Sequence, residues 1–179
     1  AYTHIPLDPQ KGETRDPEFL RINPSGKIPV LVDGDFVLTE STAIAGYLAS
    51  LQPTPLLRDD PRVRAKIAQW SSWAVAEMEP PVTRLVRARR DAAGAGHALD
   101  ATLAQSAAAE IAAALTTLER HLASGTEYCI AGEFTLADIN AAGAVMAAPL
   151  LIDMAAFPAT GAWLARIFAR PAWHRVKAL

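Results

Sequence analysis

The chain has 179 residues, of which 51% are hydrophobic and 20% charged, and its formal net charge is -2. These values are typical of a globular protein, no apolar run reaches the roughly 18 residues of a membrane span, and the longest basic run, Arg89-Arg90, gives no sign of nucleic-acid binding. The single cysteine, Cys129, excludes an intrachain disulfide and favours a reducing, cytoplasmic compartment.

The first 51 residues mix strand and helix signals. Side chains alternate along residues 1–8 as they do in a strand, and Asp16 followed by Pro17 is a typical helix start. Asp33-Gly34-Asp35 is a short hairpin signal between two β-rich runs. The sequence therefore predicts, in chain order, a strand at 1–8, a helix at 16–23, strands at 27–33 and 35–40, and a helix at 41–51.

After a proline-rich linker at residues 52–60, the pattern becomes almost entirely helical. Apolar residues recur at three- and four-residue spacing along 98–123, as in a closely packed helix. Pro80-Pro81 is expected to kink or break the helical run at 60–90. Residues 61–179 are thus predicted to form an all-α bundle domain after an α/β domain at 1–51. Its further helices are expected at 135–153, 158–169 and 171–178.

One stretch of the α/β part, INPSGKIPVLVDGDFVLTEST at residues 22–42, has the groups to bind a small peptide. An X-Pro bond is the only peptide bond that takes the cis form at a cost of roughly 0.5–1 kcal/mol. A cis bond at Ile28-Pro29 would turn the backbone N–H and carbonyl of Ile28 out of the sheet. An extended peptide would then pair with these groups as an added strand does.

Glu40 and Ser41 lie where the second strand gives way to a helix. A helix start offers unpaired N–H groups and a partial positive charge, which suit a carboxylate. Ser41 adds a hydroxyl, Glu40 can receive an ammonium group, and Lys27 can face a second carboxylate. Together these groups suit glutathione. The same residues also fit a purely structural interpretation, with a proline opening an edge strand and a serine capping a helix.

The run NPSGKIPVLVDGDFVLTESTAIAGYLA resembles the glutathione-binding half of the cytosolic glutathione transferases of bacterial type. In that family a thioredoxin-like domain precedes a helical domain. The residue before a cis-proline pairs with the cysteinyl backbone of glutathione, and an acidic-Ser pair holds its γ-glutamyl group. By position the resemblance assigns these roles to Ile28 before Pro29 and to Glu40 with Ser41. Lys27 lies where a polar residue often approaches the glycyl carboxylate. Glutathione as co-substrate and a homodimer are also implied.

A second run, GEFTLADINAAG, resembles the signature of the family's helical domain. Physically, Thr135 is the expected N-cap of a helix, and Asp138 is the acid that completes a capping box with it. Phe134 and Ile139 are placed to form the hydrophobic staple that accompanies such a cap. We therefore expect Asp138 to be structural and not catalytic.

The family's pattern begins with a strand and a helix before the strand predicted at 1–8. The loop after that first strand carries the tyrosine, serine or cysteine that activates the glutathione thiol. No segment of this sequence matches such a unit, so we expect it to lie upstream of Ala1. The thioredoxin-like domain is accordingly expected to be incomplete, and the catalytic residue is unknown.

In the family, the first helix of the helical domain lines the pocket for the electrophile. By position the candidates are Trp73, Met78, Arg84 and Arg87, although the apolar spacing of Trp73 also fits the core. Cys129 is expected to be a small buried hydrophobe. No histidine has ligand spacing with another histidine or with cysteine, so no metal site is expected.

Two functions follow from this resemblance. The first is an enzyme that conjugates the glutathione thiolate, the nucleophilic form, to a small electrophile. Isomerisation of the maleylacetoacetate type and thiol–disulfide exchange are variants of it. The alternative is a non-catalytic binding or regulatory scaffold with the same fold. The presence of both Ile28-Pro29 and Glu40-Ser41 favours glutathione binding, because a pure scaffold needs neither.

Overall fold

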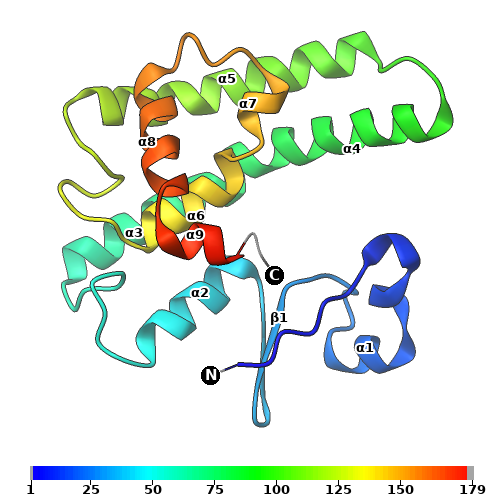
Figure 1. Cartoon of the computed structure of the whole chain (residues 1–179), viewed down its shortest axis with the longest axis horizontal. Coiled ribbons are helices and arrows are strands. Elements are labelled where there is room, and N and C mark those ends of the chain that lie inside the picture. The colour runs from blue at the N-terminus through cyan, green and yellow to red at the C-terminus, as the bar shows by residue number, and fades with distance from the viewer. Residues whose placement is uncertain (1, 177–179) are drawn as a thin grey trace. The chain divides into compact units, whose positions relative to one another are not determined.

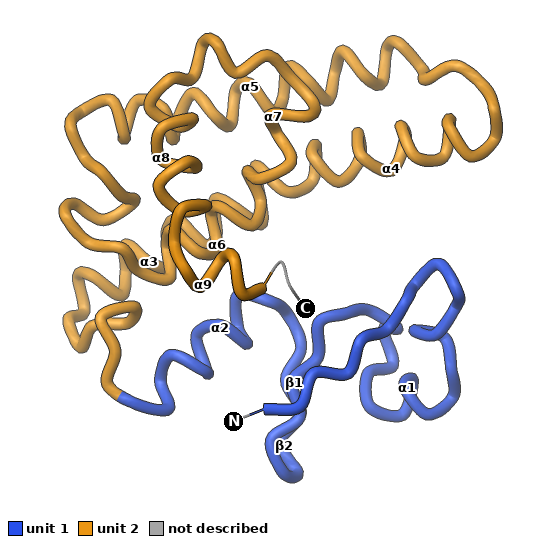
Figure 2. Tube along the Cα trace, in the orientation of Figure 1, with its two compact units in different colours: residues 1–52 blue, residues 53–179 orange. Residues whose placement is uncertain are grey.

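The computed structural model describes residues 2–176 of the chain (Figure 1). The chain divides into two compact units, residues 1–52 (unit 1) and residues 53–179 (unit 2), which Figure 2 distinguishes by colour. Within the described residues, no helix combines the length and the apolar character needed to span a membrane.

Unit 1 contains, among its described residues, one β-hairpin and several short helices. Pairing of Val30 with Thr39 and of Asp33 with Phe36 sets the register of the hairpin. Gly34 closes the turn with φ at 63°, a conformation that glycine adopts without steric cost. The predicted hairpin and both predicted helices of this unit are confirmed. The elements are η1 (Pro9–Lys11), η2 (Glu13–Arg15), α1 (Pro17–Ile22), β1 (Val30–Asp33), β2 (Phe36–Thr39) and α2 (Ser41–Ser50).

The strand predicted at 1–8 is wrong for residues 2–8, and Ala1 lies outside the described residues. Residues 2–8 have no regular structure, and the described sheet consists of β1 and β2. A strand needs a neighbour that accepts and donates its ladder hydrogen bonds, and Pro6 has no N–H to donate. The alternation of side chains indicated an extended segment but contained no information about a pairing partner.

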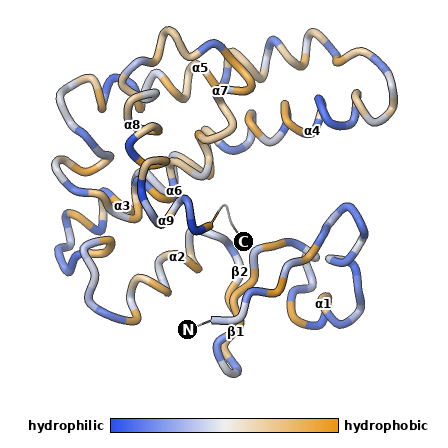
Figure 3. Tube along the Cα trace, viewed as in Figure 1, coloured by the Kyte–Doolittle hydropathy of each residue, from blue (hydrophilic) through white to orange (hydrophobic). Residues whose placement is uncertain are grey.

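Unit 2 is built from helices packed side by side, with α3 against α6 and α5 against both α4 and α8. Figure 3 shows hydrophobic and hydrophilic residues alternating along α4, as expected for a helix with one buried face. The elements are α3 (Pro61–Trp73), η3 (Ala74–Met78), α4 (Glu79–Ala95), α5 (Ala101–Ala123), α6 (Leu136–Val145), α7 (Ala148–Leu151), α8 (Pro158–Phe168) and α9 (Pro171–Val176). The largest core side chains, each 0% or 1% exposed, are Met78, Leu85, Ile111, Leu115, Leu118, Val145 and Trp163.

The helical run at 60–90 continues through Pro80-Pro81. Of the two predicted outcomes, a kink or a break, the break is therefore wrong, and the kink stays a prediction. A π-helical turn, η3, joins α3 to α4, and the two prolines occupy the first turn of α4. Proline has no N–H for the bond to the preceding turn, and its ring crowds the carbonyl four residues earlier. A π turn is wider than an α turn and relieves this crowding, because its hydrogen bonds reach one residue further.

The segment expected as a linker makes specific contacts within unit 2. The backbone N–H of Leu136 donates to the carbonyl of Leu56 over 3.0 Å. Arg58 forms an ion pair with Glu133. Residues 53–60 therefore belong to the helical unit and lie against the start of α6.

A buried carboxylate joins three segments of unit 2. Thr135 and Asp138 form the predicted capping box at the start of α6, with the Thr135 N–H donating to Asp138 Oδ2 over 3.0 Å. The other oxygen, Oδ1, accepts from the Cys129 N–H at 2.8 Å and from Trp163 Nε1 at 2.9 Å. Asp138 is 0% exposed. Its expected role as a structural residue is thus wider than a helix cap, because it also holds α8 and the loop before α6.

The staple partners Phe134 and Ile139 have different surroundings. The Phe134 ring contacts Tyr128 with a centroid separation of 5.7 Å and lies under the guanidinium of Arg170. Ile139 is 39% exposed. The ring of Phe134 therefore has aromatic and cationic partners that the cap pattern did not predict, and the staple itself stays a prediction.

Cys129 is 2% exposed, which confirms its predicted place as a small buried residue. Burial raises the pKa of the Cys129 thiol far above its usual range, and the nearby carboxylate of Asp138 raises this pKa further. A thiol in such surroundings stays protonated and is a poor nucleophile.

A second carboxylate holds the start of α8 from a distance. The residue that precedes α8, Phe157, makes no side-chain cap. Glu119 on α5 instead accepts from the N–H of Ala159 at 3.0 Å and from the N–H and the hydroxyl of Thr160 at 2.8 Å each. Burial opposes the charge of Glu119, but these hydrogen bonds outweigh burial and lower its pKa.

Glu119→Gln is expected to lower the free energy of unfolding by about 1–2 kcal/mol at neutral pH, because an amide has only one acceptor oxygen and no charge. The lowered pKa gives the carboxylate a contribution that is present above its unfolded pKa and is lost as pH falls through the folded value. The difference between wild type and Glu119→Gln should therefore shrink in acid. Urea unfolding at neutral and acidic pH measures this difference in the free energy of unfolding. Glu127→Gln, at an exposed position, is the control. A difference that does not change with pH contradicts the assignment.

Candidate functional site

The register of the hairpin brings two predicted binding segments to one end of unit 1. Because Val30 pairs with Thr39, residues 28–29 and residues 40–41 both lie at the open end of the hairpin, opposite the turn at Gly34. The hairpin predicted around Gly34 already implied this proximity, and the observed register fixes it. The site that can form here combines free backbone groups on one strand with the first turn of α2 on the other.

Ile28 lies at the edge of this open end. The Ile28-Pro29 peptide bond is cis, and Ile28 is 47% exposed. No described residue forms a hydrogen bond with the backbone N–H or carbonyl of Ile28. An extended peptide segment can pair with these two groups as a further strand would.

A buried asparagine fixes the turn that precedes Ile28. Asn23 is 5% exposed, and its Nδ2 donates to the carbonyl of Lys27 over 2.7 Å. Its Oδ1 accepts from the N–H of Ser25 at 3.1 Å and from the Ser25 hydroxyl at 2.9 Å. Gly26 completes the turn with φ at 63°, and a Cβ there would lie 3.0 Å from the carbonyl oxygen of Thr14.

The Lys27 side chain is exposed. The backbone of Lys27 is held by the hydrogen bond from Asn23, so the Asn23 side chain determines where the backbone of Lys27 and Ile28 runs. The sequence analysis did not single out Asn23. The Asn-Pro-Ser sequence signals it, since asparagine side chains commonly bond to the backbone two residues on.

Glu40 and Ser41 leave the start of α2 open. Glu40 has a positive φ of 68° with ψ at 117°, and its side chain makes no cap. The first backbone bond of α2 runs from the N–H of Ile44 to the carbonyl of Glu40. The N–H groups of the preceding turn therefore remain available for a carboxylate. A positive φ is uncommon outside glycine, and such residues cluster at functional sites.

Tyr47 positions α2 across the hairpin. Its hydroxyl donates to Asp33 Oδ2 over 2.7 Å, and its ring lies 5.0 Å from that of Phe36. The hydrogen bond to Asp33 is the main cause that raises the pKa of Tyr47. The sequence did not predict this bond, because no local pattern links two residues on different elements.

The four candidates for the electrophile pocket lie in unit 2 and have unlike surroundings. Trp73 is 7% exposed and Met78 is 0% exposed, so both belong to the core, and their burial argues against contact with a bound substrate. Arg84 donates to Glu110 over 2.6 Å. Arg87 is exposed on α4. The two arginines therefore remain as predictions, and the two apolar residues are explained by packing.

The architecture of a small α/β unit with a ligand-accepting hairpin, followed by a helical unit, defines a class of two-domain thioredoxin-like proteins. The family model "Glutathione S-transferase, N-terminal domain" matches residues 1–50, and "Glutathione S-transferase, C-terminal domain" matches residues 75–171. The chain belongs to the glutathione S-transferase family.

Individual relatives agree with this assignment. Glutathione S-transferase 3 of Zea mays is 38% identical, over 97% of this chain and 81% of the relative. The crystal structure of a possible glutathione S-transferase from Rhodopseudomonas palustris superposes with a TM-score of 0.78 at 33% identity, covering 92% of this chain and 73% of the other. The glutathione transferase URE2P6 from Phanerochaete chrysosporium, solved with oxidized glutathione, gives a TM-score of 0.84 at 27% identity, with 99% and 84% covered.

These findings confirm the predicted family, the predicted fold class and the predicted transferase activity. None of the comparisons favours the alternative of a non-catalytic scaffold. The roles of the individual site residues remain predictions.

Proposed function

We propose that this glutathione transferase binds glutathione as its co-substrate at the open end of the hairpin in unit 1. The backbone of Ile28 pairs with the cysteinyl residue of glutathione, and Pro29 holds that backbone at the edge of β1. The carboxylate of the γ-glutamyl residue lies at the first turn of α2 beside Ser41, and its ammonium faces Glu40. Lys27 faces the glycyl carboxylate.

The observation that carries this proposal is the hairpin register. It gathers an unpaired backbone segment, an uncapped helix start and charges of both signs at one end of one unit. A tripeptide with two carboxylates and one amine matches these groups in number and in sign. The bound thiolate then forms a bond to an electrophilic carbon of a small substrate, whose leaving group departs with the bonding electrons. We also propose that the protein is a cytoplasmic homodimer.

Ser41→Ala is expected to weaken the binding of glutathione about tenfold, since it removes a hydroxyl that bonds to a charged carboxylate. Isothermal titration of full-length protein with glutathione, together with retention on glutathione-agarose, measures the loss. Ser50→Ala is the matched control, because Ser50 lies at the other end of the same helix and its hydroxyl donates to the carbonyl of Tyr47 over 2.7 Å.

The control variant should bind glutathione as the wild type does. Equal affinities of the wild type and Ser41→Ala would remove Ser41 from the site. Well-folded full-length protein that shows no retention on glutathione-agarose would overturn the proposal as a whole.

A further inference from the structure

Helix α2 is joined to the hairpin of unit 1 by the chain at one end only. Strand β2 ends at Thr39 and α2 begins at Ser41, so Glu40 alone separates the two elements. No residue of α2 is buried, so apolar packing supports the helix weakly along its length. The direction of the helix axis therefore depends on a second point of attachment.

Tyr47 supplies this second attachment near the turn of the hairpin. Its hydroxyl donates to Oδ2 of Asp33, the last residue of β1, over 2.7 Å. Its ring lies 5.0 Å from the ring of Phe36, the first residue of β2. Asp33 and Phe36 face each other in the hairpin register. One side chain of the helix thus contacts both strands.

The same contact joins the two parts of the proposed glutathione site. Asp33 ends the strand that Ile28 precedes, and Tyr47 lies on the helix that begins at Ser41. Tyr47 lies about 9 Å along the helix from Ser41, at about 1.5 Å per residue. A contact so far from the connection at Glu40 determines the direction of the helix axis. The first N–H groups of α2 point along that axis.

We propose that Tyr47 and Asp33 are positioning residues for glutathione, which set the angle between the first turn of α2 and the edge at Ile28 before the ligand binds. The inference rests on the proposed function, in which glutathione contacts both parts of the site at once. A helix that is already oriented loses less conformational freedom on binding, so the affinity is higher. Both residues lie toward the turn of the hairpin and act through α2, not by contact with the ligand.

Isothermal titration of full-length protein with glutathione measures the effect. Tyr47→Phe keeps the ring beside Phe36 and removes the hydroxyl, and we expect it to bind glutathione about fivefold more weakly. Asp33→Ala, which removes the acceptor, should have the same effect. The double variant should bind no more weakly than either single variant, because all three lose the same hydrogen bond. Asp33→Asn keeps an acceptor oxygen and should recover part of the affinity.

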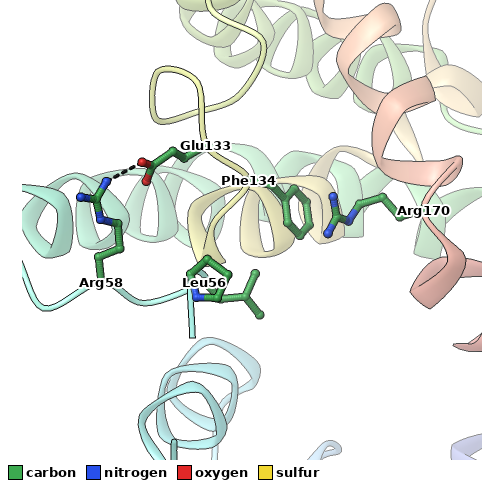
Figure 4. Close-up of a pocket in the computed structure, with 6 residues that line it drawn as sticks. Leu56, Arg58, Glu133, Phe134 and Arg170 are labelled. Carbon is green, nitrogen blue, oxygen red and sulfur yellow. Dashed lines mark hydrogen bonds and ion pairs between the residues drawn. The ribbon is translucent and has the colours of Figure 1, made fainter. Parts of the chain in front are cut away.

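Tyr128→Phe and Glu133→Gln are the matched controls in unit 2. The first removes the hydroxyl of another half-buried tyrosine, whose ring lies 5.7 Å from that of Phe134. The second replaces a carboxylate that accepts a hydrogen bond from Arg58, which the dashed line in Figure 4 marks. This bond also joins segments far apart in sequence. Both controls should bind glutathione as the wild type does.

Hydrogen exchange of the amides of residues 44–50 distinguishes a positioning role from a contribution to stability alone. In the free protein these amides should exchange faster in Tyr47→Phe than in the wild type. Saturation with glutathione should remove this difference, because the bound ligand then orients the helix. Thermal unfolding of each variant shows whether the fold survives the substitution.

The outcomes separate this inference from the proposed function. Absence of glutathione binding by well-folded wild-type protein would overturn both. Binding by the wild type with an equal affinity in Tyr47→Phe would overturn the inference alone. Additive losses in the double variant would also overturn it, since the two side chains would then act independently. A difference in exchange that persists in the glutathione complex would show that the bond serves stability only.

Discussion

Asp138→Ala is expected to lower the free energy of unfolding of unit 2 by about 3 kcal/mol or more. The substitution leaves three buried N–H donors without an acceptor, those of Cys129, Thr135 and Trp163. Each unsatisfied buried donor costs about 1–3 kcal/mol, and the loss of the helix cap is part of that sum. Few single substitutions have a larger effect on a domain of this size.

Urea unfolding followed by tryptophan fluorescence measures this loss, because all four tryptophans of the chain lie in unit 2. Asp138→Asn keeps an oxygen for Cys129 and Trp163 but turns an amide group toward Thr135, so we expect an intermediate loss. Asp153→Ala is the control, since Asp153 accepts a single exposed bond, from the Ala155 N–H over 2.9 Å. A variant Asp138→Ala as stable as the control would show that the network contributes little.

Asn23→Ala is expected to weaken glutathione binding at least about tenfold, although Asn23 itself need not touch the ligand. The side chain makes three hydrogen bonds within the turn at residues 23–27. Without them the carbonyl of Lys27 loses its donor, and the backbone of Ile28 is no longer held in the conformation that pairs with a peptide. Ordering that segment on binding then opposes the affinity.

Calorimetric titration with glutathione gives the affinity, and hydrogen exchange of the amides of residues 25–33 reports the order of the turn. Faster exchange together with weaker binding is the expected result. Asn140→Ala is the matched control, because Asn140 lies in unit 2 and donates one bond to Ser71 Oγ over 2.8 Å. Unchanged affinity in Asn23→Ala would mean that Ile28 is positioned by other contacts.

Features that depend on neighbours in sequence could be predicted. The turn at Gly34, the proline at the start of α1 and the pair Thr135 and Asp138 each act over four residues or fewer, so their signals are complete in a short window. The start of α2 could also be predicted locally, because the sequence changes from a strand pattern to a helix pattern at Glu40 and Ser41.

Features that depend on a distant partner could not be predicted. The segment at residues 2–8 has strand-like alternation, but pairing requires a second strand that no local pattern identifies. Tyr47 reaches Asp33, and Asp138 reaches Trp163, only because the fold brings them together. The burial of Met78 likewise follows from packing against neighbouring helices and not from its place beside two prolines.

The way in which α8 begins has a consequence for the order in which unit 2 assembles. Asp100 caps α5 from the adjacent position, accepting from the N–H groups of Thr102 and Leu103, so that α5 contains its own nucleation signal. The first N–H groups of α8 donate instead to Glu119, which lies on α5 and some forty positions earlier in the chain. The first N–H groups of α8 therefore gain their acceptor only when α8 packs against α5, so this part of the stability of α8 depends on docking and not on local propensity.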